Sequence, residues 1–274
     1  MRTAIIALLL IFGQLPLHAA EQRIYSVGVV PQFEVKRLHE IWRPILDALE
    51  RRTGLRFQLI GSPTISAFER EFSAGRFDFA YMNPYHIMLA QQRAGYIPLV
   101  RDVAQQLYGI VVTRREGTIE QVGDLANQIV AFPDSNALGA TLLIRQAFAD
   151  KFHLRVEPRY VKTHDSVYLN VALGQVAAGG GVQKTLMQQN ERVRSLLKVI
   201  YTTDSVSPHP LAVHPRVPHD VAEAVKQAML ALGNSAEGKR LLTAIPIEQI
   251  GPASMADYAS LADLDLQRFY LGTP

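Results

Sequence analysis

Short apolar strands alternate with helix-forming stretches along this sequence, and the alternation stops once and then begins again. The first series runs over residues 24–100, and its longest helical stretch, 35–52, places its leucines, its isoleucines and Trp42 on one face. After a polar break at 114–118 a second series runs over 128–203. Strands separated by helices favour parallel pairing. The sequence therefore predicts an α/β protein of two lobes, each a mostly parallel sheet flanked by helices.

Two extended hinge crossings, near 107–113 and 205–213, are predicted to join the lobes. We assign residues 21–109 and 210–274 to the first lobe and residues 110–209 to the second, and we expect a ligand between them. In the second lobe the pattern predicts a helix at 136–148. Glycines 179–181 are expected to form a tight turn that leads into a helix at 182–190.

The first twenty residues have the pattern of a secretory signal peptide. Arg2 precedes an uncharged apolar run from Ala4 to Phe12, and small residues follow up to Ala20. The run is too short to span a bilayer and no later span follows, so we expect a mature chain without direct membrane insertion. The predicted location is the periplasm, and we expect a monomer.

Composition excludes several classes of function. The chain contains no cysteine, which removes thiol catalysis, zinc sites of the cysteine kind and a lipid anchor. Its formal net charge is only +3 and it has no dense basic run, so nucleic acid is not an expected partner.

Residues 75–90, GRFDFAYMNPYHIMLA, are the most informative segment for function. A buried strand runs into a turn, and a helix begins there with Asn83 as its cap. In an open α/β sheet the turns at the carboxyl ends of strands border the ligand crevice. Asn83, Tyr85 and His86 are therefore binding candidates, with an ordinary capped helix as the alternative.

Two further strand-to-helix turns have a composition suited to a ligand. The first carries Gln32, which can donate a hydrogen bond, and Phe33, which can stack. The second carries Ser135 and Asn136 at the start of a helix, where free backbone N–H groups and the helix dipole favour an anion. Capping without a ligand is the alternative for this turn.

A fourth turn places His164 beside Asp165 where a strand gives way to a helix. The imidazole can donate to an anionic oxygen, and the neighbouring carboxylate can raise its charged fraction. Asp204 and His209 lie at the second crossing and would border the same cleft. Four such turns at one end of their sheets favour a shared binding site.

Three segments occur in the order in which a known family carries its landmarks: GRFDFAYMNPYHIMLA, FPDSNALGATLLIRQAF and THDSVYLNVALGQVAAGGGVQKTL. Over residues 27–213 the chain resembles the phosphate/phosphite/phosphonate-binding periplasmic proteins of ABC transporters. The resemblance implies a type II-like periplasmic-binding-protein fold that closes over a small anionic ligand (phosphonate-, phosphite- or oxyanion-like) and delivers it to a membrane ABC permease. Several family members are thought to sense ligands for membrane histidine kinases instead, which is the alternative role.

The resemblance and the residues together predict a ligand site at the four turns and the second crossing. Its members are Gln32, Phe33, Asn83, Tyr85, Ser135, Asn136, His164 and Asp204, with Tyr81, His86, Asp165 and His209 as further candidates. One departure concerns Asp134, because a carboxylate at the anion turn should repel a dianion unless it points away or meets an amino group of the ligand.

A serine hydrolase and a metal site are the alternatives from other classes. Ser135, His164 and Asp165 offer a nucleophile, a base and an orienting acid, but the sequence has no Gly-x-Ser-x-Gly elbow. The histidines and carboxylates of the same turns offer metal ligands, but without a short ligand spacing. We therefore expect a non-enzymatic protein with no cofactor and no metal.

Overall fold

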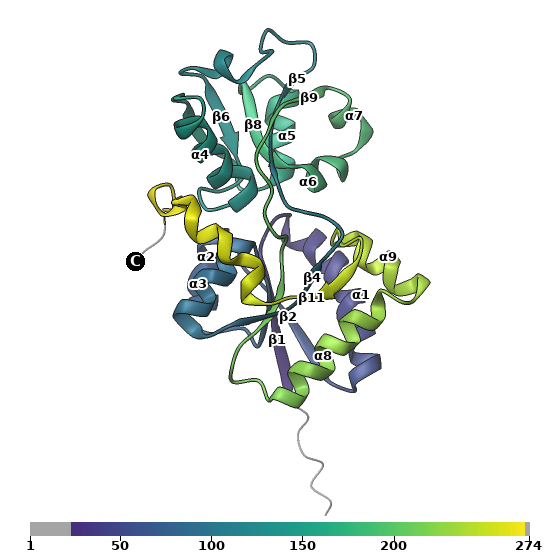
Figure 1. Cartoon of the computed structure of the whole chain (residues 1–274). Helices are drawn as coiled ribbons and strands as arrows, with labels where there is room; N and C mark the ends of the chain where they lie inside the picture. The colour runs from purple at the N-terminus through teal and green to yellow at the C-terminus, as the bar shows by residue number, and fades with distance from the viewer. Residues whose placement is uncertain (1–22, 272–274) are drawn as a thin grey trace, which may run out of the picture.

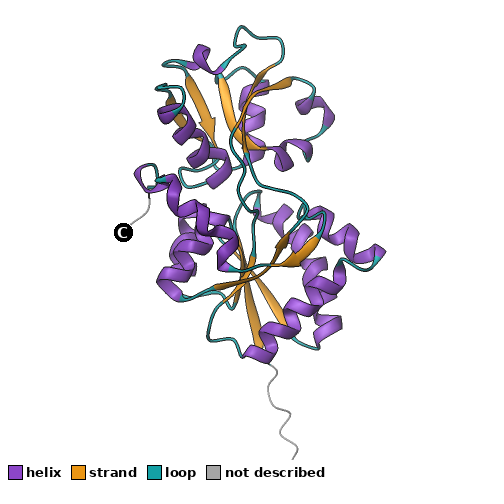
Figure 2. Ribbon diagram, in the orientation of Figure 1, coloured by secondary structure: helices purple, strands orange, loops and turns teal. Residues whose placement is uncertain are grey.

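The computed structural model describes residues 23–271, which form two lobes joined by two extended crossings (Figure 1). Each lobe has one sheet with helices packed on its faces (Figure 2). The two-lobed α/β fold predicted from the sequence is confirmed. The predicted signal peptide, 1–20, lies outside the described residues. Among residues 23–271, no helix combines the length and the apolar character that crossing a membrane requires.

Lobe 1 is built on a six-stranded sheet with the strand order β11-β4-β10-β3-β1-β2. Its strands are β1 (Ile24–Val29), β2 (Arg56–Gly61), β3 (Phe79–Tyr81), β4 (Ile97–Asp102), β10 (Leu211–Val213) and β11 (Ile250–Pro252). Its helices are α1 (Val35–Thr53), α2 (Ile65–Ser73), α3 (Pro84–Ala94), α8 (His219–Leu232) and α9 (Ala236–Ala244), followed by the 3₁₀ helices η3 (Met255–Leu264) and η4 (Leu266–Arg268).

The predicted apolar stripe of α1 packs on this sheet. Trp42, Ile45 and Leu46 are fully buried and join Phe79 of β3 in one core cluster. Helix α1 ends at Gly54, whose φ of 70° lies in the left-handed region that glycine adopts without steric cost.

Lobe 2 has a five-stranded sheet with the strand order β7-β6-β8-β5-β9. Its strands are β5 (Gly109–Arg114), β6 (Ile129–Phe132), β7 (Glu157–Tyr160), β8 (Ala178–Val182) and β9 (Leu197–Thr202). Its helices are η1 (Val122–Leu125), the π-helical turn η2 (Leu138–Leu142), α4 (Leu143–Asp150), α5 (His164–Ala172), α6 (Gln183–Met187) and α7 (Glu191–Arg194).

Both sheets are mixed, whereas the sequence predicted mostly parallel ones. Strands that a helix connects are parallel, as in β1 with β2 and β3 and in β6 with β7 and β8. The strands that follow the two crossings, β5 and β10, and the last strand, β11, pair antiparallel with their neighbours. β10 pairs with β3 and β4, β11 with β4, and β5 with β8 and β9. Helical crossovers enforce parallel pairing between the strands that they connect, and none of these antiparallel pairs consists of two successive strands joined by a helix.

The prediction of a tight turn at glycines 179–181 is wrong, because these residues form the middle of β8. An added Cβ at Gly180 would lie 2.1 Å from the carbonyl oxygen of Ala140, and one at Gly181 would lie 2.2 Å from the Tyr168 hydroxyl. The glycines therefore let η2 and α5 pack directly against the strand. The helix predicted at 182–190 is the shorter α6, and the helix predicted at 136–148 begins only at Leu138.

Candidate ligand-binding site

Residues of both lobes line a hollow at the cleft, which we call the His164 cavity. Lobe 1 contributes Gln32 and Asn83 from the turns after β1 and β3, and lobe 2 contributes His164 from the start of α5. His209 reaches the cavity from the second crossing. The rest of the lining is apolar and includes residues 137–140 at the start of η2. Polar side chains from three of the four predicted turns thus line one cavity, and apolar residues that follow the fourth turn also line it.

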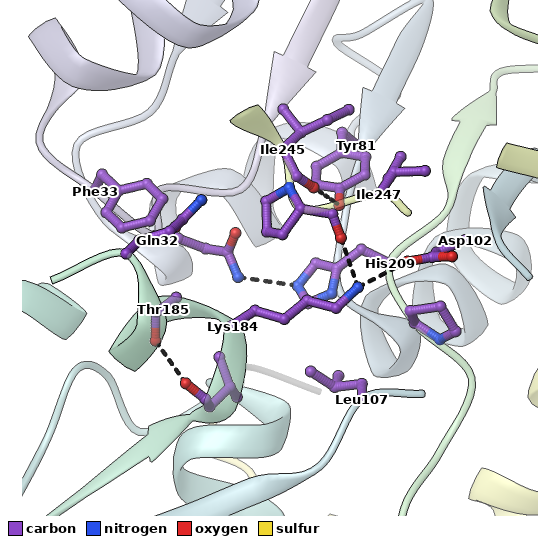
Figure 3. Close-up of a pocket in the computed structure, with 14 residues that line it drawn as sticks. Gln32, Phe33, Tyr81, Asp102, Leu107, Lys184, Thr185, His209, Ile245 and Ile247 are labelled. Carbon is purple, nitrogen blue, oxygen red and sulfur yellow. Dashed lines mark hydrogen bonds and ion pairs between the residues drawn. The ribbon is translucent and has the colours of Figure 1, made fainter. Parts of the chain in front are cut away.

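A second cavity, the Lys184 cavity, adjoins the first, because Gln32, Val182 and His209 line both. Figure 3 shows its lining, with the Lys184 side chain reaching toward Asp102. Phe33 and Tyr81, both predicted site residues, lie in this second cavity.

Lys184 connects the lobes across the cleft. Its Nζ lies 2.9 Å from Asp102 Oδ2 and 2.6 Å from the carbonyl oxygen of Pro246, so the start of α6 in lobe 2 is tied to lobe 1. Burial raises the pKa of Asp102, but hydrogen bonds from Lys184 and from backbone N–H groups outweigh it and lower that pKa. Arg37 of α1 and Asp165 of α5 form a second cross-lobe ion pair at 2.9 Å. Asp165 therefore bonds to lobe 1 and does not orient His164.

Asn83 caps α3 as predicted: its Oδ1 accepts from the His86 backbone N–H at 2.8 Å, and its Nδ2 lies 3.0 Å from His86 Nε2. The same imidazole nitrogen lies 2.9 Å from Oε1 of the buried Glu69. Asn83 thus both caps the helix and lines the His164 cavity, whereas His86 faces Glu69 and does not line it.

The anion turn at 133–137 differs from the expectation. Asn136 does not line the His164 cavity, because its Nδ2 donates to Glu69 Oε2 at 2.9 Å, and its Oδ1 accepts from the Leu271 N–H at 2.9 Å. The Ser135 hydroxyl donates to Asp134 at 3.4 Å. Asp134 also accepts from the Asn136 N–H at 3.0 Å and so closes its own turn outside the cavity lining. Because the Asp134 carboxylate is bound within its own turn and does not line the cavity, we expect it to repel a bound anion less strongly than a carboxylate in the lining would.

The imidazole of His164 is buried and that of His209 is half-buried, and neither has a carboxylate partner among the described residues. His164 Nδ1 lies 3.2 Å from the Thr185 hydroxyl, and burial lowers the pKa of His164 to about 4 against a small opposing effect of Asp165. His209 Nε2 lies 3.2 Å from Gln32 Nε2, and its ring stacks on Tyr81. Burial lowers the pKa of His209 to about 3, and the nearby cation Lys184 adds to that effect. Both rings are neutral at pH 7.

Two predicted residues lie elsewhere. The Tyr85 hydroxyl donates to Gln267 Oε1 at 2.8 Å and its ring packs against Tyr270, so the C-terminal segment covers it. Asp204 is exposed and lines a separate hollow between α4 and the C-terminal segment. Neither side chain lines the His164 or the Lys184 cavity.

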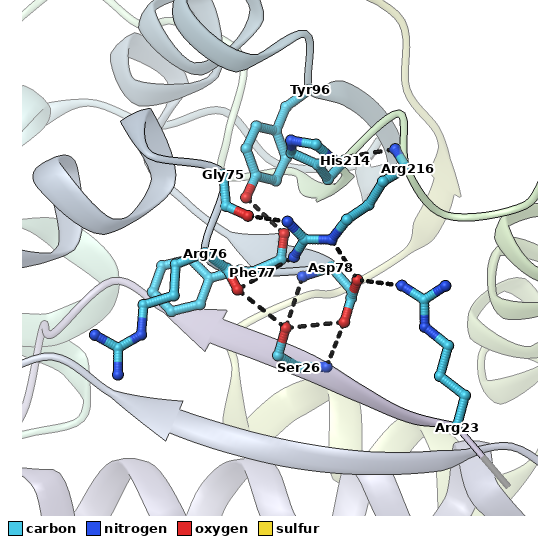
Figure 4. Close-up of polar contacts among 9 residues, drawn as sticks. All are labelled: Arg23, Ser26, Gly75, Arg76, Phe77, Asp78, Tyr96, His214 and Arg216. Atoms are coloured by element: carbon cyan, nitrogen blue, oxygen red, sulfur yellow. Dashed lines mark hydrogen bonds and ion pairs between the residues drawn. The ribbon is translucent and has the colours of Figure 1, made fainter. Parts of the chain in front are cut away.

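A further buried polar cluster lies at the opposite, amino-terminal ends of β1 and β3. Asp78 accepts from Arg216 Nε at 2.8 Å, from Arg23 at 3.0 Å, and from the Ser26 backbone N–H at 2.8 Å (Figure 4). Arg216 also donates to the carbonyl of Gly75. Because these charges satisfy one another, we assign the cluster to the stability of lobe 1.

The residues proposed for a serine hydrolase do not form a catalytic triad in the structure. Among the described residues Ser135 bonds to Asp134, His164 to Thr185, and Asp165 to Arg37, so no two of the three proposed catalytic groups hydrogen-bond to each other. In the same part of the chain no three His, Asp or Glu side chains gather where they could hold a metal ion.

The family model described as "ABC transporter, phosphonate, periplasmic substrate-binding protein" matches residues 27–258. The chain belongs to this family. Phosphonate-family proteins of this kind are periplasmic and bind a substrate without converting it, so the chain is not an enzyme. A similar protein is the phosphate-import protein PhnD of Mycolicibacterium smegmatis, 20% identical over 223 residues that cover 73% of this chain and 69% of PhnD.

Solved structures support the fold. The binding protein component of an ABC phosphonate transporter from Pseudomonas aeruginosa has a TM-score of 0.80 and 17% identity, covering 91% of this chain and 88% of its own. PhnD1 from Prochlorococcus marinus, in complex with methylphosphonate, has a TM-score of 0.80 and 13% identity, covering 89% of this chain and 98% of its own.

Sequence reasoning missed Lys184, Asp102 and Glu69. Glu69 and Asp102 lie within or at the end of regular elements, where a single carboxylate has an ordinary surface interpretation. Only their burial, 5% and 1% exposed, distinguishes them. Lys184 lies near the start of the predicted helix at 182–190, where a single lysine also has an ordinary surface interpretation.

Proposed function

We propose that this protein closes its lobes over a small oxyanion, of the phosphonate, phosphite or phosphate class, and delivers it to the permease of an ABC transporter. The convergence of polar side chains on the His164 cavity is the observation that carries the proposal. Hydrogen-bonding side chains from both lobes and from the crossing line this one cavity, and a concave site with a few convergent polar groups is typical of small-molecule binding.

Backbone N–H groups at the start of η2 add to the suitability for an anion. The N–H groups of residues 138–140 have no hydrogen-bond acceptor among the described residues, and these residues line the cavity. Unpaired N–H groups at a helix start favour an anionic oxygen. The phosphonate and phosphate ligands named for the relatives point to the same class.

Calorimetry and thermal unfolding with methylphosphonate, phosphite, phosphate and sulfate test the binding step. We expect one ligand per chain, and at a hundredfold excess over Kd a stabilisation of about 2.7 kcal/mol. Gln32→Ala should weaken binding because Gln32 lines both cavities. Gln227→Ala, on the exposed face of α8, is the matched control and should leave the affinity unchanged.

Absence of binding by all four anions would refute the oxyanion class. Uptake into vesicles that contain the permease and its ATPase tests delivery separately. If the protein binds an anion in calorimetry but does not support uptake of that anion into the vesicles, the binding part of the proposal stands and the transport part is refuted.

A further inference from the structure

The lining of the His164 cavity contains no charged side chain. Its polar side chains are Gln32, Asn83, His164 and His209. The neighbouring cation, Lys184, lines the other cavity and is already bound to Asp102 and to the carbonyl of Pro246. An anion that enters such a cavity loses its hydration, and neutral donors alone restore it only in part. A lining group that is neutral in the free protein and gains a proton on binding would supply the positive charge that these donors lack.

Only the two imidazoles among these lining residues can gain a proton. His164, 3% exposed, engages Thr185 through Nδ1, and its Nε2 has no hydrogen-bond partner among the described residues. His209 engages Gln32 through Nε2, and its Nδ1 has none. Each ring therefore has one nitrogen available to a ligand, and the rings approach the cavity from lobe 2 and from the crossing.

We propose that His164 and His209 take up a proton from solvent when an oxyanion enters the cavity, so that imidazolium supplies the charge that other sites take from lysine or arginine. The proposal rests on the proposed function and specifies how that site holds an anion. An anionic oxygen within hydrogen-bond distance of an imidazole stabilises its protonated form. Protonation of His209 also requires the Gln32 amide to turn and present its oxygen.

The surrounding charges agree with a neutral free state. Lys184 lowers the pKa of His209, and so do the imidazoles of His86 and His164. For His164 the nearby carboxylate is Asp165, which raises the pKa but is bound to Arg37 and Gln189. Burial keeps both rings neutral near pH 7. Affinity for a fixed-charge anion should therefore rise as pH falls, by up to about tenfold per pH unit for each proton taken up.

Calorimetry with methylphosphonate in two buffers of different ionisation enthalpy counts the protons taken up on binding. We compare the wild type with His164→Gln, His209→Gln and the double variant, and His39→Gln on the exposed face of α1 is the control. The proton that methylphosphonate itself binds is common to all proteins. We expect uptake to fall by about one proton in the double variant and to stay unchanged in the control. Equal uptake in the wild type and the double variant would overturn the proposal.

Imidazole NMR of the wild type covers the case in which the variants no longer bind. On addition of methylphosphonate at pH 7, the NMR signals of at least one of the two imidazoles, His164 or His209, should shift to the imidazolium position. Signals that stay neutral at saturation would overturn the proposal while leaving the proposed function standing. If methylphosphonate, phosphite, phosphate and sulfate all fail to bind the wild type between pH 5 and 8, both this proposal and the proposed function are refuted.

Discussion

Replacement of Lys184 by methionine is the sharpest test of how the lobes are held together. The side chain keeps its length but loses the ammonium that joins Asp102 and the carbonyl of Pro246 across the cleft. Removing one member of a buried pair typically costs about 3–5 kcal/mol. Lys184 is 24% exposed, and Asp102 keeps its backbone donors. These donors are the N–H groups of Ala104, Gln105, Glu248 and Gln249.

We therefore expect a loss of about 2 kcal/mol, which corresponds to roughly thirtyfold. Because the contact joins the lobes, the loss falls on the equilibrium between closed and open forms, and each lobe keeps its own core. Affinity for a ligand that needs the closed form should fall by up to the same factor. The free variant should also have a larger radius of gyration than the free wild type.

Small-angle scattering with and without methylphosphonate measures the opening, and calorimetry measures the affinity. Lys198→Met is the matched control: Lys198 is 20% exposed and pairs with Glu120 within lobe 2, so its loss should leave the particle size unchanged. Identical scattering and affinity for Lys184→Met and the wild type would show that this contact does not govern closure. An equal change in the control would point to a general effect of charge.

Three further predictions concern stability and the site. Gly180→Ala should destabilise the protein by about 1–3 kcal/mol in chemical denaturation, because its Cβ would overlap the Ala140 carbonyl; Gly123→Ala, with open space around it, should change stability little. Burial raises the pKa of Asp78, but hydrogen bonds from Arg216 and Ser26 outweigh it and lower that pKa. The stabilisation is therefore present above about pH 4 and is lost as pH falls through the lowered value. Asp78→Asn should cost about 2 kcal/mol at pH 7 and flatten the acid limb of the unfolding profile; an unchanged limb would contradict the assignment. Tyr85→Phe should leave methylphosphonate affinity within twofold, since its hydroxyl faces Gln267, and a tenfold loss would return Tyr85 to the site.

The fold followed from the sequence wherever one local pattern determined an element. The stripe of α1, the cap at Asn83 and the break after β5 are each set by neighbouring residues, and the structure confirms these elements. The prediction of a turn at glycines 179–181 was wrong because the feature that fixes their structure is tertiary packing, not the local sequence. Glycine has no side chain to indicate burial, and the contacts that require it come from other elements, the distant η2 and the preceding helix α5. A run of glycines in a sequence usually indicates a turn or loop.

The site followed less completely, because a turn determines where a residue lies but not which partner it meets. Asn83 and His164 line the cavity, whereas Asn136, at an equally favourable turn, meets Glu69 from the other lobe. Tyr85 is covered by the C-terminal segment, whose return to α3 no local pattern indicates. The predicted participation in ligand binding stays a prediction for every one of these residues.

The cross-lobe contacts also limit how much a ligand can change the shape of the protein. Lys184 contacts Asp102, and Asn136 contacts Glu69, so the chain itself stabilises this arrangement of the lobes. A ligand adds only its differential affinity for the closed over the open form. A partner that senses closure needs about 5.5 kcal/mol of such difference for a switch from 1% to 99%. A permease needs only that the occupied form docks. A free wild type with the same radius of gyration as the bound form would therefore favour transport over sensing. A large decrease in the radius of gyration on ligand binding would favour sensing over transport.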